Sequence, residues 1–184
     1  MLTTLVPYLA LLAVCSVAGG IDIRTGRVFN TLTYPAMLAG LLFWAVIGVS
    51  TGEPLDPLKA SATAMCVGLV PMAVIVLMGG LGGGDMKLMG AVGAISASWQ
   101  VVVATGLYAL VIAALIAVGV MIRRGIVKRT LGRLFAAAVM AGSRVKPEMP
   151  TDSPKVPFAV GIAIGAAVAG AEHFFGLRTP FSPF

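Results

Sequence analysis

Charged residues are scarce in this sequence, and cysteine and histidine are scarcer still. Only 11% of the 184 residues are charged, whereas 59% are hydrophobic. This balance excludes an ordinary soluble domain, in which about a quarter of the residues are charged. The length leaves room for about six membrane-spanning helices of ~20 residues each. The composition therefore predicts an all-α membrane protein that folds as a polytopic helix bundle.

The few potential metal ligands do not form a site. Cys15 and Cys66 lie in apolar runs, and neither belongs to a Cys-x-x-Cys pair. We therefore expect no metal and no cofactor. The single histidine, His173, falls at the end of the last apolar run, where an interfacial residue is expected. The net charge of +6 is better explained by basic cytoplasmic loops than by nucleic acid, so we expect no nucleic-acid partner.

Six apolar runs are separated by polar or glycine-rich segments. They extend over about Leu2–Ile21, Leu32–Val49, Lys59–Met78, Met86–Ser98, Val101–Ile122 and Val156–Phe175. We interpret the first as a retained span and not as a removed signal. The fourth is short for a complete crossing, since a helix rises ~1.5 Å per residue against a ~30 Å hydrocarbon core. It is either a thin span or one that begins deep in the membrane.

Glycine, proline and tryptophan suggest where these helices end or bend. Gly19-Gly20 predicts the end of the first helix. Pro71 predicts a kink and not a break in the third span, because neighbouring groups in a bundle can satisfy the freed carbonyl. Trp99-Gln100 is interpreted as an interfacial turn between the fourth and fifth runs.

The one long connection lies between the fifth and sixth runs. Its first part, around Gly125–Phe135, is basic and carries an apolar stripe at helical spacing. We expect it to lie on the membrane surface as an amphipathic helix that contacts anionic lipid. The remainder, Pro147–Pro154, is a proline-rich tether.

The distribution of basic residues predicts the orientation. With the N-terminus outside, 11 of the 13 Lys and Arg residues fall in inside loops, as the positive-inside rule requires. The chain is therefore expected in the cytoplasmic (inner) membrane, with Asp22 and Asp85 at the cytoplasmic face. The remaining acids are expected to be solvated surface charges: Glu53, Asp56, Glu148, Asp152 and Glu172.

Asp22 and Asp85 differ from those acids because each abuts an apolar run at the same membrane face. Acids there are costly and suggest a function. A structural explanation exists for each: Asp85 could be the N-cap of the fourth helix, and Asp22 could pair with Arg24 or Arg27. A functional explanation is a shared site. Two adjacent carboxyls share a proton, so one can act as a base toward water while the other protonates a carbonyl.

Three glycines and a lysine flank Asp85. Gly82, Gly83 and Gly84 would let an extended substrate backbone approach closely. Lys87 either anchors the helix at the cytoplasmic interface or binds an acidic group of the substrate.

These residues resemble the motifs of a known family. Gly82-Gly83-Gly84-Asp85-Met86-Lys87 is similar to the Gly-x-Gly-Asp-x-Lys signature of type IV prepilin leader peptidases, which are intramembrane aspartic proteases. Asp22 followed by Arg27-Val28-Phe29-Asn30 resembles the first catalytic Asp of that family with its downstream segment, although Phe29 replaces the usual Pro. Pro157-Phe158-Ala159 resembles the element that opens the family's last span.

The resemblance implies that residues 1–184 form a single integral membrane peptidase domain. Asp22 and Asp85 would be its catalytic acids, and Gly82, Gly83, Gly84 and Lys87 would bind substrate or shape the site. Its substrate would be a prepilin or pseudopilin. Larger members add a four-cysteine metal site and an amino-methyltransferase activity, so the chain looks like the short form that serves tight-adherence (Flp-type) pili without N-methylation. An archaeal preflagellin peptidase resembles the same pattern.

Two other functions stay open on the sequence. A small transporter could use Asp22 and Asp85 as a proton or cation relay, since intramembrane acids and interrupted helices are also typical of transporters. A non-catalytic assembly subunit is the third candidate. The oligomeric state, and which acid serves as the base, also stay open.

Overall fold

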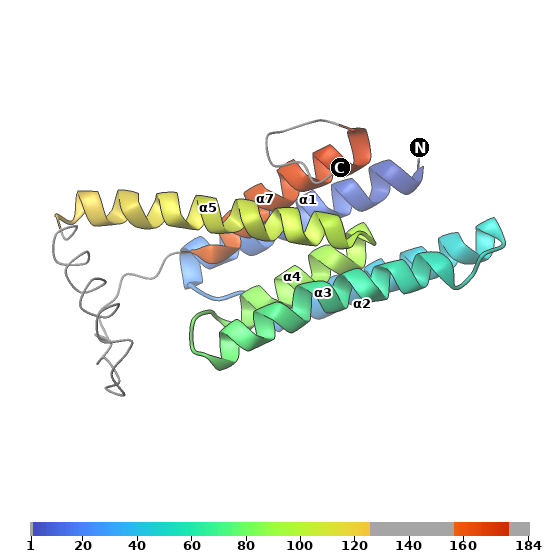
Figure 1. The fold of residues 1–184 in the computed structure, drawn as a ribbon, viewed down its shortest axis with the longest axis horizontal. Helices are drawn as coiled ribbons and strands as arrows, with labels where there is room; N and C mark the ends of the chain where they lie inside the picture. Colours follow the sequence, from blue (N-terminus) through green and yellow to red (C-terminus); the bar gives the residue numbers. More distant parts are fainter. Residues whose placement is uncertain (1, 126–156, 177–184) are drawn as a thin grey trace, which may run out of the picture. The chain divides into compact units, whose positions relative to one another are not determined.

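The computed structural model describes residues 2–125 and 157–176, where all the regular structure is helical. The helices are α1 (Leu2–Thr25), α2 (Asn30–Thr51), α3 (Asp56–Leu77), α4 (Gly83–Ser96), α5 (Trp99–Arg123) and α7 (Phe158–Phe175) (Figure 1). All of these except α4 are long and apolar enough to cross a membrane. The predicted all-α membrane bundle is thus confirmed. The expected surface helix lies outside the described residues from position 126 on.

The chain divides into two compact units. Residues 1–112 and 157–184 form the first, which contains α1 to α4, the first part of α5, and α7. Residues 113–156 form the second, of which the structure describes the end of α5 and the turn that follows. Everything described below belongs to the first unit.

Helix α1 continues to Thr25, so the end predicted at Gly19-Gly20 is wrong. Gly19 instead serves helix packing, because a Cβ placed on it would lie 3.4 Å from the Cβ of Ala163 in α7. The helix ends at Gly26, which has a φ of +63° and donates its N–H to the Asp22 carbonyl at 2.8 Å. Asp22 therefore lies within the last turn of α1 and not after it.

Helix α4 is enclosed by its neighbours (Figure 1). Its residues from Leu88 to Ser96 are all buried, and its 14 residues span about 21 Å, less than a hydrocarbon core. Glycines allow this packing. A Cβ on Gly93 would meet the Ala64 carbonyl of α3, and a Cβ on Gly40 would lie 2.7 Å from the Ala94 carbonyl. The backbones of α2 and α3 thus lie directly against α4.

The carbonyls at the end of α4 receive side-chain donors from the surrounding helices. Ser61 donates to the Ala94 carbonyl at 2.7 Å, and the indole N–H of Trp44 donates to the Ile95 carbonyl at 2.9 Å. A helix that ends inside a bundle leaves its last carbonyls without intrahelical partners, and such groups are costly away from water. These two bonds explain how α4 can be short.

The turn between α4 and α5 consists of Ala97 and Ser98. Ala97 has a φ of +50°, and the Ser98 hydroxyl accepts the N–H of Val101 at 3.4 Å. Trp99 is already the first residue of α5, so the turn expected at Trp99-Gln100 is wrong by two residues. Pro71 does lie inside a continuous α3, which agrees with the prediction that it does not break the helix.

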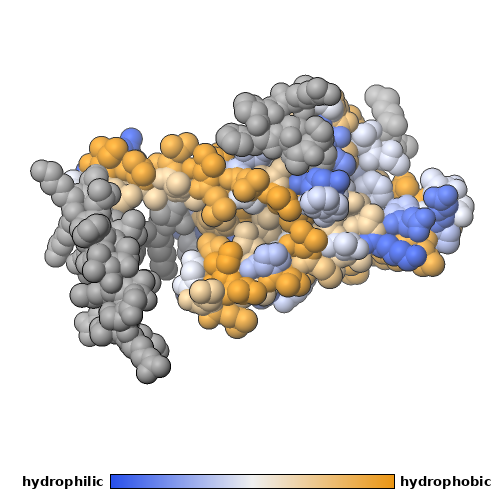
Figure 2. All heavy atoms as spheres, in the orientation of Figure 1, coloured by the Kyte–Doolittle hydropathy of each residue, from blue (hydrophilic) through white to orange (hydrophobic). Residues whose placement is uncertain are grey.

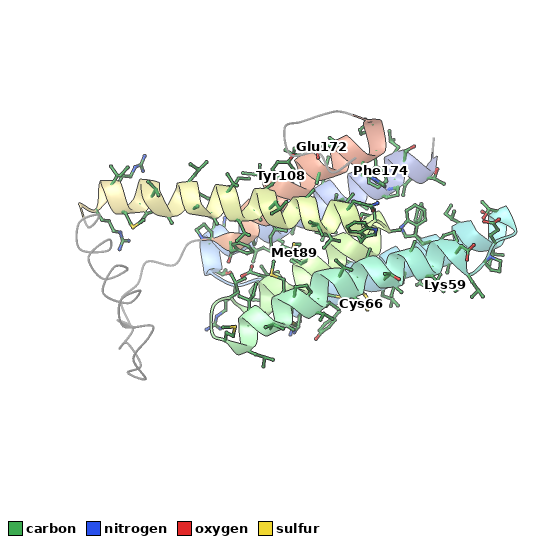
Figure 3. The ribbon with its side chains drawn as sticks, viewed as in Figure 1. Lys59, Cys66, Met89, Tyr108, Glu172 and Phe174 are labelled. Atoms are coloured by element: carbon green, nitrogen blue, oxygen red, sulfur yellow. The ribbon has the colours of Figure 1, made fainter. Side chains whose placement is uncertain are left out.

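The expectation for Glu172 is wrong as well. We expected a solvated surface acid, but its side chain is only 2% exposed. It lies in the last turn of α7, where Tyr108 of α5 donates to its Oε1 at 2.7 Å (Figure 3). Helix α7 packs closely on α5 along this face, since a Cβ on Gly165 would lie 2.7 Å from the Thr105 carbonyl. Hydropathy alone does not reveal which side of a span faces protein.

The outer surface is apolar. Figure 2 shows hydrophobic atoms along the helices and hydrophilic atoms where α2 joins α3. Exposed large apolar side chains include Leu9, Leu38, Val46, Val70 and Leu110. Such a surface suits lipid and not water, so the chain is an integral membrane protein.

Candidate active site

A cavity of about 250 Å³ lies at one end of the first unit, where α1 ends and where α2 and α4 begin. Its lining consists of both candidate acids, the glycine run and part of the α1–α2 connection: Asp22, Gly26, Arg27, Val28, Gly82, Gly83, Gly84 and Asp85. Two segments separated by two helices in the sequence therefore meet at one cavity. Among the predicted site residues, Lys87 does not line it.

Asp22 is buried, with 8% of its surface exposed. Its Oδ2 accepts the N–H of Ala159 at 3.3 Å, in the first turn of α7. A carboxylate in the last turn of α1 lies at the negative end of that helix dipole, which is unfavourable. The start of α7 is the positive end of its own dipole, and its first N–H groups have no acceptor within the helix, so it stabilises the carboxylate. The suggested pairing with Arg24 or Arg27 is not found, because neither arginine forms an ion pair with a described residue.

Asp85 is the third residue of α4, and Gly82 occupies the N-cap position that the sequence suggested for Asp85. The two residues bond reciprocally. The Asp85 N–H donates to the Gly82 carbonyl at 3.1 Å, and the Gly82 N–H donates to the Asp85 carboxylate. The pKa of Asp85 is raised to about 6, mostly by burial and also by the negative charge of Asp22, whereas the Gly82 N–H opposes both effects. The two carboxyls therefore interact electrostatically.

The three glycines of the run have different surroundings. A Cβ on Gly84 would lie 2.9 Å from the carbonyl oxygen of Val28 and 3.0 Å from its Cβ. A Cβ on Gly83 would meet nothing within 4 Å, and one on Gly82 would only touch the Asp85 carboxyl at 3.5 Å. Packing within the chain thus explains Gly84 but leaves Gly82 and Gly83 open toward the cavity.

Lys87 connects α4 to the start of α2. Its ammonium donates to Oδ1 of Asn30 at 2.7 Å and lies 4.8 Å from the centre of the Tyr34 ring. These contacts lie beside the cavity and hold the first turns of α4 and α2 together. The sequence did not reveal these two partners of Lys87.

Sequence reasoning missed the donor to Asp22. The Pro157-Phe158-Ala159 segment was noted only as a motif, and the useful group is a backbone N–H that carries no residue-specific signal. An acid at the C-terminal end of one helix needs a donor, and the start of another helix is a common source. Within the described residues, no group of three or more His, Cys, Asp or Glu side chains is placed to hold a metal ion.

An all-helical membrane bundle with two interacting carboxyls on one cavity has the fold and site of an intramembrane hydrolase or of an ion carrier. Residues 9–122 match the model of the type IV leader peptidase family. This range is more than half of the chain and includes both acids, so the protein belongs to that family. It is accordingly a protease, and the family implies a prepilin-type substrate.

The matched range extends from α1 to the end of α5 and does not include α7. The N–H of Ala159 therefore comes from a helix outside the matched segment. No curated protein and no solved structure matches the chain. The family match favours the peptidase over the transporter that the sequence left open.

Proposed function

We propose that this protein is an aspartic endopeptidase that removes the leader of Flp-type prepilins or pseudopilins. Asp22 and Asp85 are its catalytic acids. The observation that carries the proposal is the cavity of about 250 Å³ that both carboxyls line, together with the effect of the Asp22 charge on the pKa of Asp85. A cavity of this size has room for water and for a short length of main chain.

The chemistry follows from a pair of carboxyls that holds one proton. The ionised carboxyl takes a proton from water as the water oxygen attacks the scissile carbonyl carbon. The protonated carboxyl gives its proton to the carbonyl oxygen, which produces a neutral tetrahedral diol. Collapse of the diol breaks the C–N bond, and the leaving nitrogen takes up the proton that the first carboxyl received. One diol hydroxyl returns its proton to the second carboxyl as the new carboxylic acid forms, so the pair again holds one proton.

Isosteric variants test the two acids. Asp22→Asn and Asp85→Asn each remove one acid–base group, so we expect processing of a prepilin by purified protein in nanodiscs to fall by at least about 100-fold. Asp56→Asn is the matched control, because Asp56 is an exposed acid outside the cavity. Processing at the unsubstituted rate by both site variants would contradict the proposal.

The remaining features extend the proposal to the whole chain. Residues 1–184 form one peptidase domain in the inner membrane, with the N-terminus outside and the acids at the cytoplasmic face. Basic residues near the cavity, Arg24, Arg27 and Lys87, support this orientation. The contact of the basic segment Gly125–Phe135 with anionic lipid stays a prediction.

The short form is proposed to cleave without methylating. The support is that the sequence contains two cysteines, one in α1 and one in α3, and neither belongs to a Cys-x-x-Cys pair. Mass spectrometry of the cleaved pilin, made with S-adenosylmethionine present, should find a free, unmethylated N-terminal amine. A product heavier by one methyl group would refute this part alone.

A further inference from the structure

Arg27 is the one cationic residue among those that line the cavity. Two other basic residues lie nearby, but Lys87 is bonded to Asn30, and Arg24 is exposed and does not line the cavity. Arg27 is also solvent-exposed. The cavity is therefore lined by two acids and one exposed arginine.

The backbone on both sides of Arg27 is fixed. The Thr25 hydroxyl donates to the Arg27 carbonyl at 3.1 Å and to the Ile21 carbonyl at 2.9 Å, which ties the connection to the end of α1. On the other side, Val28 lies against Gly84 at a distance that leaves no room for a Cβ. The position of Arg27 relative to the glycine run is thus set by packing.

Arg27 does not neutralise the candidate acids. It forms no ion pair within 4.0 Å among the described residues, and its charge is not among the causes that shift the pKa of Asp85. A guanidinium has five N–H donors and accepts no hydrogen bond. Since Arg27 is exposed and pairs with no acid among the described residues, these donors are accessible to an oxygen of another molecule that enters the cavity.

We propose that Arg27 binds a main-chain carbonyl oxygen of the substrate as its peptide passes over Gly82 and Gly83. The glycine side of the cavity is open, since a Cβ on Gly83 would meet nothing within 4 Å. An extended peptide laid there presents its main-chain carbonyls to the residues that line the cavity, and Arg27 is one of them. This inference rests on the proposed function. It adds a binding residue and leaves the acid–base chemistry to Asp22 and Asp85.

Arg27→Gln and Arg24→Gln form a matched pair of variants. Both remove one positive charge from an exposed residue at the same end of the bundle, but only Arg27 lines the cavity. With a peptide that spans the cleavage site, Arg27→Gln should raise KM about tenfold or more and leave kcat within about twofold. Arg24→Gln should change KM less than about twofold. Equal effects of the two variants, or a loss confined to kcat, would overturn the inference.

Binding to an uncleaved substrate separates this inference from the proposed chemistry. In an Asp85→Asn background, fluorescence anisotropy of the labelled peptide should still give about tenfold weaker binding for Arg27→Gln than for Arg24→Gln. Failure of the proposed function would instead appear as undiminished cleavage by Asp22→Asn and Asp85→Asn. Unchanged melting temperatures of the arginine variants would exclude a merely structural effect.

A modified peptide identifies the group that Arg27 contacts. When every Asp and Glu of the peptide is replaced by its amide, the Arg27→Gln defect should persist, because main-chain carbonyls are unaffected. Loss of the defect with the amide peptide would show that Arg27 pairs with a side-chain carboxylate, and the main-chain assignment would be wrong. Arg27→Lys should recover less than half of the lost affinity, because a lysine lacks the planar fork of donors.

Discussion

Two causes, burial and the charge of a neighbouring carboxyl, together raise the pKa of Asp85. Its pKa is raised to about 6, first by burial and then by the charge of Asp22. Asp22→Asn removes the second cause and leaves the first. We therefore expect the pKa of Asp85 to fall in this variant but to stay above 3.8, its ordinary value. The pH dependence of the infrared C=O band of protonated Asp85 measures this, and Asp85→Asn identifies the band.

The same shift predicts the pH dependence of stability. The folded protein holds the Asp85 proton more tightly than the unfolded chain does, so the unfolding free energy should decrease as pH rises from about 3.8 to about 6. The decrease should be smaller in Asp22→Asn. An identical Asp85 titration in the two proteins would mean that the carboxyls do not interact.

Gly83 and Gly84 are neighbours with opposite expected responses to a methyl group. Gly84→Ala forces Val28 to move, so we expect a loss of about 1–3 kcal/mol of unfolding free energy and a lower melting temperature. Gly83→Ala has open space at the start of a helix, so its melting temperature should stay unchanged. If substrate passes over Gly83, this variant should still cleave prepilin more slowly. Full activity of Gly83→Ala would place the substrate elsewhere.

For individual residues, the sequence predicted the two candidate acids of the site but not the groups that hydrogen-bond to the site residues. Asp22 and Asp85 could be singled out because both abut apolar runs at one face. Asp22 accepts the N–H of Ala159, and Lys87 donates to the side-chain oxygen of Asn30. Both contacts depend on how helices from distant parts of the chain meet. Local sequence patterns carry no information on such contacts.

Helix α4 is the element whose environment most determines the site, because it carries Asp85 in its first turn. The glycines that seat it against α3 are expected to be intolerant of substitution. Gly93→Ala would drive a methyl group into the Ala64 carbonyl of α3. We expect a loss of about 1–3 kcal/mol or more, together with loss of prepilin cleavage, as α4 is displaced.

Gly20→Ala provides the control for Gly93→Ala. Gly20 also lies inside a helix, but a Cβ on it would meet nothing within 4 Å. Alanine favours helix over glycine by about 1 kcal/mol, so this variant should melt at the same or a higher temperature. Circular dichroism melts in detergent compare the two. Equal destabilisation by both substitutions would show that contact between α3 and α4 is not the cause.

For residues 2–125 and 157–176, the number and order of the helices were predictable, whereas their ends were less so. Apolar runs locate spans because a hydrocarbon core demands about 20 apolar residues. Gly19-Gly20 was misleading because glycine inside a membrane helix also allows close contact between helices, as Gly19 does with Ala163. The short α4 was recognised from its length, but the Ser61 and Trp44 bonds that satisfy its end belong to other helices.

The orientation of the whole molecule determines where a leader would be cut. Arg24 lies at the end of α1 beside the cavity, and Glu53 follows the far end of α2. The 22 residues of α2 span about 33 Å, enough to cross the hydrocarbon core. A label that cannot cross the membrane should therefore reach these two positions from opposite sides. The positive-inside rule predicts that Arg24 is the cytoplasmic one.

Single-cysteine variants test this arrangement. In a Cys15→Ala, Cys66→Ala background, Glu53→Cys should react with an impermeant maleimide in intact spheroplasts. Arg24→Cys should react only in inverted vesicles, because its thiol faces the cytoplasm. Labelling of both positions from one side would mean that α2 does not cross the bilayer. Labelling with the sides reversed would place Asp22 and Asp85 at the outer face, and a leader would then have to be removed after its passage through the membrane.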